Sequence, residues 1–129
     1  MLARRCGPAQ RKVTAVDVGC DHLGQVEVCR VRGELDAFTT SEFREWAARL
    51  CGSAKAVFDL GELTFMDSAG LGALIGAIRR IRETGGEVVL NSPRPLVTRM
   101  LRTAGIDRIV LMTGSIEEAV THFLGAAVA

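Results

Sequence analysis

The stretch Phe65-Met66-Asp67-Ser68-Ala69-Gly70-Leu71-Gly72-Ala73-Leu74-Ile75-Gly76 marks the passage from a loop into a helix. After Asp67 and Ser68, apolar side chains recur at helical spacing and predict a helix that runs to about Thr84. The glycine pair that follows Thr84 is a typical helix stop. The apolar residues predicted to form the buried face of this helix are Leu71, Leu74, Ile75, Ile78 and Ile81.

Strand and helix patterns alternate on both sides of this segment. Residues 13–18 and 25–31 are predicted strands joined by a turn at 21–24, and Gly33 is expected to break the second strand. Residues 61–66 are expected to form a loop. Further strands are predicted at 55–60, 87–91 and 108–112, and further helices at 39–51, 92–105 and 115–125. Strands that alternate with helices of this length favour crossover connections, so the sequence predicts an α/β fold, and the initial hairpin makes its sheet mixed.

Two helix starts carry the pattern of a capping box, in which a Ser or Thr side chain and an acid three residues later satisfy each other's free backbone N–H groups. Thr39 and Glu42 predict one such start, and Ser115 and Glu118 predict another. The helix at 92–105 is instead predicted from its prolines, because a first helical turn tolerates proline.

Composition indicates one domain that folds without disulfides or metals. The chain has 129 residues, of which 48% are hydrophobic. Residues 1–12 carry four bases and no acid, so the remainder holds twelve bases against fifteen acids, a formal charge of −3. We interpret residues 1–12 as a basic, flexible or cloning-derived segment in preference to a nucleic-acid-binding arm, and residues 13–129 as the domain.

Nothing in the sequence predicts a membrane segment or a metal site. The longest uncharged stretch, 68–78, falls short of the roughly 20 residues that a membrane helix needs, and the N-terminus lacks the apolar core of a signal peptide. A cytoplasmic location is therefore expected. Cys6, Cys20, Cys29 and Cys51 form no CxxC pair and no histidine stands at metal-ligand spacing, so free thiols are predicted, with a redox disulfide as the alternative.

Ser68 stands where backbone N–H groups at a helix start favour an anion, so a phosphate on its hydroxyl would be well accommodated. The alternative is that Ser68 is a plain N-cap. Small residues follow on one side of the helix at Ala69, Gly72, Ala73 and Gly76. Because helix-interior glycines cost about 0.5–1 kcal/mol each, they indicate close approach of another backbone, either a docking partner or the sheet below.

Two enzymatic interpretations of this segment are weak. The glycine run would suit a dinucleotide site, but no acid ends the next predicted strand, which reaches Asn91. A serine hydrolase elbow requires glycine where Met66 stands. His22 and His122 fall in a predicted turn and the last predicted helix, and are expected to be surface residues and not catalytic bases.

The order of short motifs resembles the STAS domains, in particular the bacterial anti-sigma-factor antagonists. Residues 67–72, Asp-Ser-Ala-Gly-Leu-Gly, resemble the Asp-Ser-Ser-Gly-Leu-Gly motif of that family. Residues 33–36, Gly-Glu-Leu-Asp, match a second family segment, and 85–87 and 101–109 fit as well. The resemblance spans about 13–125. It implies a mixed sheet of about four to five strands with helices mainly on one side.

The resemblance also implies a function without catalysis, cofactor or metal. The unphosphorylated protein would bind an anti-sigma factor, a serine/threonine kinase, and so free a sigma factor. Phosphorylation of Ser68 would weaken the complex, and a separate serine phosphatase would restore it. Direct nucleic-acid or membrane partners are not implied. The residues expected to bind the partner are Asp36, Asp67, Ala69, Gly70, Gly72, Ala73 and Gly76.

The sequence departs from the family motif at Ala69, where many relatives have a second serine. This change leaves Ser68 as the single phospho-acceptor of the motif and removes one hydroxyl from the expected interface. For Asp36, the alternative is a polar residue that leads into the Thr39 cap. For the whole chain, the alternative function is a passive subunit of a lipid-transport or stress-signalling assembly, which would take no phosphate.

Overall fold

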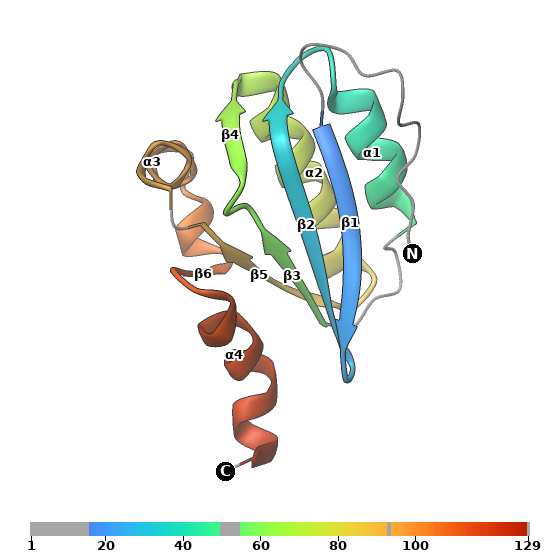
Figure 1. Ribbon diagram of the computed structural model, residues 1–129, viewed down its shortest axis with the longest axis vertical. Coiled ribbons are helices and arrows are strands. Elements are labelled where there is room, and N and C mark those ends of the chain that lie inside the picture. The colour runs from blue at the N-terminus through green and yellow to red at the C-terminus, as the bar shows by residue number, and fades with distance from the viewer. Residues whose placement is uncertain (1–15, 50–54, 93, 129) are drawn as a thin grey trace.

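The computed structural model describes residues 16–49, 55–92 and 94–128, which form a mixed sheet with helices on both faces (Figure 1). The six strands have the order β1-β2-β3-β5-β6, and β4 pairs with β2 beyond the end of β3. The β1–β2 pair is antiparallel and the other pairs are parallel, so the mixed α/β prediction is confirmed. The elements are β1 (Val16–Leu23), β2 (Val26–Leu35), α1 (Thr40–Ala48), β3 (Lys55–Asp59), β4 (Leu63–Met66), α2 (Ser68–Glu83), β5 (Glu87–Asn91), α3 (Pro95–Thr103), η1 (Ile106–Arg108), β6 (Leu111–Thr113) and α4 (Ile116–Val128).

The sheet separates two apolar clusters because alternate strand residues face opposite sides. On β3, Ala56 and Phe58 face the larger cluster, which α1, α2 and α3 cover, whereas Val57 faces a smaller cluster under α4. Helices therefore lie mainly on one side, as the family resemblance implied. Within the described residues no helix is long and apolar enough to cross a membrane.

The strand β4 corrects the predicted loop at 61–66. Leu63 and Met66 are buried while Thr64 and Phe65 are exposed, and the segment pairs with the end of β2. Four residues with only two buried positions give too short a pattern to distinguish from a loop. This added strand carries the chain directly to the start of α2.

Gly33 does not end β2, contrary to the sequence prediction. The strand continues to Leu35 through an irregularity between Gly33 and Glu34, where Gly33 has a φ of 93°. Its N–H donates to the carbonyl oxygen of Glu62 at 3.0 Å. A bulge of this kind bends a strand without terminating it, and here it brings the end of β2 alongside β4.

The first hairpin is longer than predicted and turns later. Of the predicted strand 13–18, residues 13–15 lie outside the described residues, and β1 extends to Leu23. The turn is at Gly24 and Gln25, not at 21–24, and Gly24 adopts the positive φ of 65° that favours glycine. The chain therefore pairs eight residues on each strand.

The predicted strand at 108–112 is shifted, because η1 takes residues 106–108 after Gly105 and the strand β6 occupies 111–113. The Ser115–Glu118 capping box is confirmed in one half: Ser115 Oγ accepts from Glu118 N, whereas the Glu118 carboxylate accepts from Gly114 N and not from Ser115 N. The Thr39–Glu42 box is wrong, since the Thr39 side chain makes no cap hydrogen bond to α1.

Candidate functional site at the start of helix α2

Ser68 is the first residue of α2 and is exposed to solvent. Asp67, and not Ser68, is the N-cap: its extended backbone and its Oδ1, which accepts from Gly70 N at 2.8 Å, meet the description of a cap. The simple N-cap interpretation of Ser68 is therefore wrong. The Ser68 hydroxyl forms no hydrogen bond with any part of the chain that the structure describes, and so remains available.

Asp67 also joins two parts of the site. Its Oδ2 accepts from the backbone N–H of Ala37 at 3.2 Å, and its own N–H donates to Leu35 O at 3.3 Å. One carboxylate thus connects the start of α2 to the loop that follows β2. Those bonds fix the position of the first turn of α2 relative to the end of the sheet.

Gly70 permits this close approach. A Cβ at position 70 would lie 2.0 Å from the carbonyl oxygen of Leu35, a distance that no side chain tolerates. Gly70 is accordingly buried against β2. Its role in the motif is to bring backbone against backbone inside the protein, not at a partner surface.

Asp36 is buried, with 7% of its surface exposed. Its Oδ1 accepts from the N–H groups of Phe38 at 2.9 Å and Thr39 at 3.2 Å, and its own N–H donates to Thr39 Oγ1 at 2.9 Å. The alternative interpretation, a polar residue that leads into α1, describes these contacts. The structure nevertheless places Asp36 one residue from Ala37, which Asp67 binds.

The exposed side of α2 carries Ser68, Gly72 and Gly76, spaced four residues apart. Nothing lies within 4 Å of a Cβ added at Gly72 or Gly76, so these glycines do not face the sheet. Ala73 is 2% exposed and belongs to the core. The predicted small-residue face is therefore rotated: Gly70 and Ala73 point inward, and Ala69 is half-buried at its border.

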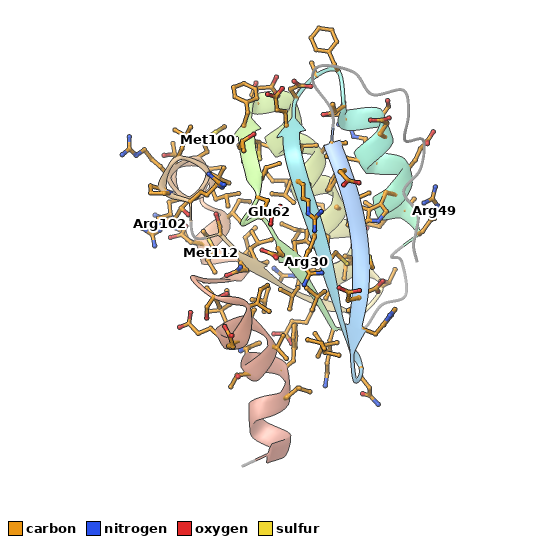
Figure 2. The ribbon with its side chains drawn as sticks, in the orientation of Figure 1. Arg30, Arg49, Glu62, Met100, Arg102 and Met112 are labelled. Atoms are coloured by element: carbon orange, nitrogen blue, oxygen red, sulfur yellow. The ribbon has the colours of Figure 1, made fainter. Side chains whose placement is uncertain are left out.

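Two exposed phenylalanines lie on the segments that adjoin the start of α2, and sequence reasoning missed them. Phe38 follows Asp36 with 84% of its surface exposed, and Phe65 at the end of β4 is 44% exposed. The ends of β2 and β4 and the start of α2 lie together in Figure 1. Figure 2 shows Met100 of α3 beside β4, and Leu96 of the same helix is also exposed. No alternation in the sequence revealed Phe65, because β4 is buried at Leu63 and Met66 and exposed at the two residues between them.

We call the exposed residues around the motif, Phe38, Phe65, Ser68, Gly72 and Gly76, the Ser68 surface. Comparisons with known proteins identify the family to which the chain belongs. The STAS domain profile matches residues 20–119. The chain belongs to the STAS domain family. The anti-sigma F factor antagonist of Paenibacillus polymyxa is 32% identical over 98 residues, which cover 74% of this chain and 84% of that protein.

Solved structures agree on the fold of this STAS domain. An anti-sigma factor antagonist from Mycobacterium paratuberculosis superposes with a TM-score of 0.75 at 20% identity, covering 83% of this chain and 92% of that one. A putative anti-sigma factor antagonist from Thermotoga maritima gives 0.72 at 25% identity, with 81% and 92% covered.

The two histidines of this STAS domain lie away from the Ser68 surface. His22 is near the tip of the β1–β2 hairpin, at the opposite end of β2 from Leu35, and lies in a strand and not in the predicted turn. His122 in α4 contacts Glu87, with its Nε2 2.9 Å from a carboxylate oxygen. Both are exposed, as predicted.

Proposed function

We propose that this STAS domain is an anti-sigma factor antagonist whose binding is switched by phosphorylation of Ser68. The observation that carries the proposal is the Ser68 hydroxyl, exposed and without a hydrogen bond in the described structure, at the first residue of α2. The names of the relatives support the same function. In this proposal the protein binds and is modified, and performs no catalysis itself.

The helix start favours a phosphate on Ser68 without rearrangement of the chain. The positive end of the helix dipole and the free N–H groups of the first turn stabilise an anion. Asp67 already occupies the N–H of Gly70, and its carboxylate repels a second anion nearby. A phosphate of about −1.5 to −2 charges would therefore stay directed outward, toward whatever covers the Ser68 surface.

The Ser68 surface has the composition of a docking site. Exposed aromatic residues such as Phe38 and Phe65 commonly supply the anchors of protein interfaces. Gly72 and Gly76 leave a flat strip on α2 where a partner backbone approaches closely. The partner we propose is an anti-sigma factor of the serine/threonine kinase type, with a serine phosphatase acting on phospho-Ser68.

Phosphate at the centre of this contact would act as the switch. An unpaired charge forced into a partner built for a neutral hydroxyl costs several kcal/mol. A loss of about 2.7–4 kcal/mol weakens affinity roughly 100- to 1000-fold. Such a loss separates a bound state from a free state at ordinary protein concentrations.

The test begins with capture of partners from the source cell on the immobilised protein, followed by identification of a kinase-type partner. That partner and ATP are then incubated with the parent and with a Ser68→Ala variant, and phosphate is located by mass spectrometry. One phosphate on Ser68 of the parent and none on the variant supports the proposal. A stable complex that takes no phosphate would instead indicate a passive subunit of a larger assembly.

A further inference from the structure

The β1–β2 hairpin brings together four metal-ligand side chains that are scattered in the sequence. The register pairs Cys20 with Cys29 and His22 with Glu27. Residues two apart on a strand face the same side, so all four belong to one face of the hairpin. In the described part of the chain, the only group of three or more His, Cys, Asp or Glu side chains with converging donor atoms is formed by Cys20, Glu27 and Cys29.

The donor atoms are already close to one another. The sulfur atoms of Cys20 and Cys29 are 3.3 Å apart, and the donor atoms of Cys20, Glu27 and Cys29 all lie within 4.8 Å of one another. His22 Nε2 lies 3.9 Å from Glu27 Oε2. The fourth side chain therefore stands next to Glu27, outside the group of three whose donor atoms already converge.

These distances match the requirements of tetrahedral zinc. Zinc binds sulfur at about 2.3 Å and nitrogen or oxygen at about 2.0–2.2 Å, which places two sulfur ligands about 3.8 Å apart and a nitrogen–oxygen pair about 3.4 Å apart. The observed separations of 3.3 Å and 3.9 Å each differ from these by about half an ångström. Side-chain torsions can supply a change of that size, and the exposed His22 must in addition rotate toward the two cysteines to complete the site.

We propose that Cys20, His22, Glu27 and Cys29 form a zinc site that joins the two strands of the hairpin near its tip. Two thiolates, an imidazole and a carboxylate are a donor set that suits zinc better than magnesium or calcium, which prefer oxygen alone. Cys29 is fully buried, whereas Cys20 and His22 are exposed and give the ion a path from solvent.

The two thiols of the metal-free hairpin form a hydrogen-bonded pair. The hydrogen bond between the two thiols, together with burial, raises the pKa of Cys29 above its ordinary value. Zinc must displace the thiol proton, as it does at thiolate sites in general. The ion would also bind both sulfur atoms, which within the described residues form a weak hydrogen bond to each other.

The neighbouring residues on the other face of the hairpin supply a matched control. Asp21 and Arg30 stand beside the cysteines in sequence but form an ion pair with each other. Figure 2 shows Arg30 on the face of β2 that is turned away from α1 and α2. An Asp21→Asn change therefore alters an exposed carboxylate near the site without removing a ligand.

Cobalt(II) is the probe, because its visible bands report tetrahedral geometry and its near-ultraviolet band reports sulfur ligation. Cys6→Ser and Cys51→Ser form the background, so that the thiols which remain are Cys20 and Cys29. Under reducing conditions we expect one cobalt ion per chain, a thiolate band, and full displacement by zinc. The Asp21→Asn variant should bind equally well.

Removal of a metal ligand should weaken metal binding, and more so for a cysteine thiolate than for the histidine. We expect a Kd at least 100-fold higher in Cys20→Ser and at least 10-fold higher in His22→Gln. Both side chains are exposed, so the metal-free variants should melt at the temperature of the parent. Zinc should raise the melting temperature of the parent and of Asp21→Asn by more than that of either ligand variant. Cobalt spectra without a thiolate band, or zinc affinity that survives both substitutions, would overturn the proposal.

Discussion

At the scale of single residues, the motif 67–72 contains two kinds of residue: some contact the interior of the protein and others face solvent. Asp67 caps α2 and holds the loop after β2, while Gly70 lets the helix start lie against Leu35. Ser68 and Gly72 face solvent. A short motif can therefore contain two kinds of residue, and the structure distinguishes those that hold the backbone in place from those that are exposed to a partner.

The two glycines of the motif should respond in opposite ways to alanine. Gly70→Ala forces a Cβ against the Leu35 carbonyl, and we expect a loss of about 2–3 kcal/mol in the free energy of unfolding. Gly72→Ala fills open space on a helix and should gain about 0.5–1 kcal/mol. Urea denaturation of both variants measures the difference. Equal effects of the two substitutions would contradict the assignment of Gly70 to the interior.

Asp67 should matter for stability more than Ser68 does. Asp67→Ala removes the cap on Gly70 N and the bond to Ala37 N, and we expect a cost of about 1–2 kcal/mol. Ser68→Ala removes a hydroxyl that makes no hydrogen bond within the described residues, so its unfolding free energy should stay within about 0.5 kcal/mol of the parent. Thermal and urea unfolding check both values. A larger cost for Ser68→Ala would show that this hydroxyl has a structural role.

At the scale of elements, the outward strip of α2 should tolerate a large side chain until a partner is present. Gly72→Leu adds bulk where a Cβ meets nothing within 4 Å, so we expect unchanged or raised thermal stability. The same change should weaken partner binding at least 10-fold by calorimetry, because it blocks close approach to the Ser68 surface. The control is Glu117→Leu, an exposed position in α4 on the other face of the sheet. Equal binding by both variants would remove α2 from the interface.

Sequence patterns predicted α2 and the buried strands β3 and β5 well, whereas they missed β4 and misplaced the ends of the first hairpin. The periodicity of α2 placed it at its observed bounds within one residue. The strand β4 was missed because its four residues bury only Leu63 and Met66. At α1, the Thr39–Glu42 spacing fitted a capping box. In the structure the Thr39 hydroxyl instead accepts from Asp36 N, and the Asp36 carboxylate accepts from Thr39 N.

The candidate zinc site could not be predicted from the sequence because the turn of the first hairpin was predicted at the wrong position. The predicted turn at 21–24 gives no pairing of Cys20 with Cys29, because that pairing follows from a two-residue loop at Gly24 and Gln25. A register error of this kind changes which side chains oppose each other. The motif at 67–72 was not affected by such an error, because its residues are contiguous in the sequence and no strand register is needed to bring them together. Phe38 was missed for a different reason, since loop residues carry no periodicity that reveals exposure.

At the scale of the whole molecule, we expect phosphorylation of Ser68 to act locally and to leave the fold unchanged. The first turn of α2 is held by Asp67 and packs at Gly70 against the end of β2, and the rest of the helix lies on the larger apolar cluster. A phosphate that projects outward from Ser68 strains none of these contacts, and the helix start stabilises its charge. Amide NMR spectra of the phosphorylated and unphosphorylated protein should therefore differ mainly at 66–72 and at 36–38, which Asp67 connects to the site. Ser68→Asp and Ser68→Glu should weaken partner binding in the same direction, because they place a negative charge at the same position. Amide shifts spread through the strands β5 and β6 and through α4, which packs on the opposite face of the sheet from α2, would instead require a conformational mechanism and would refute the local one.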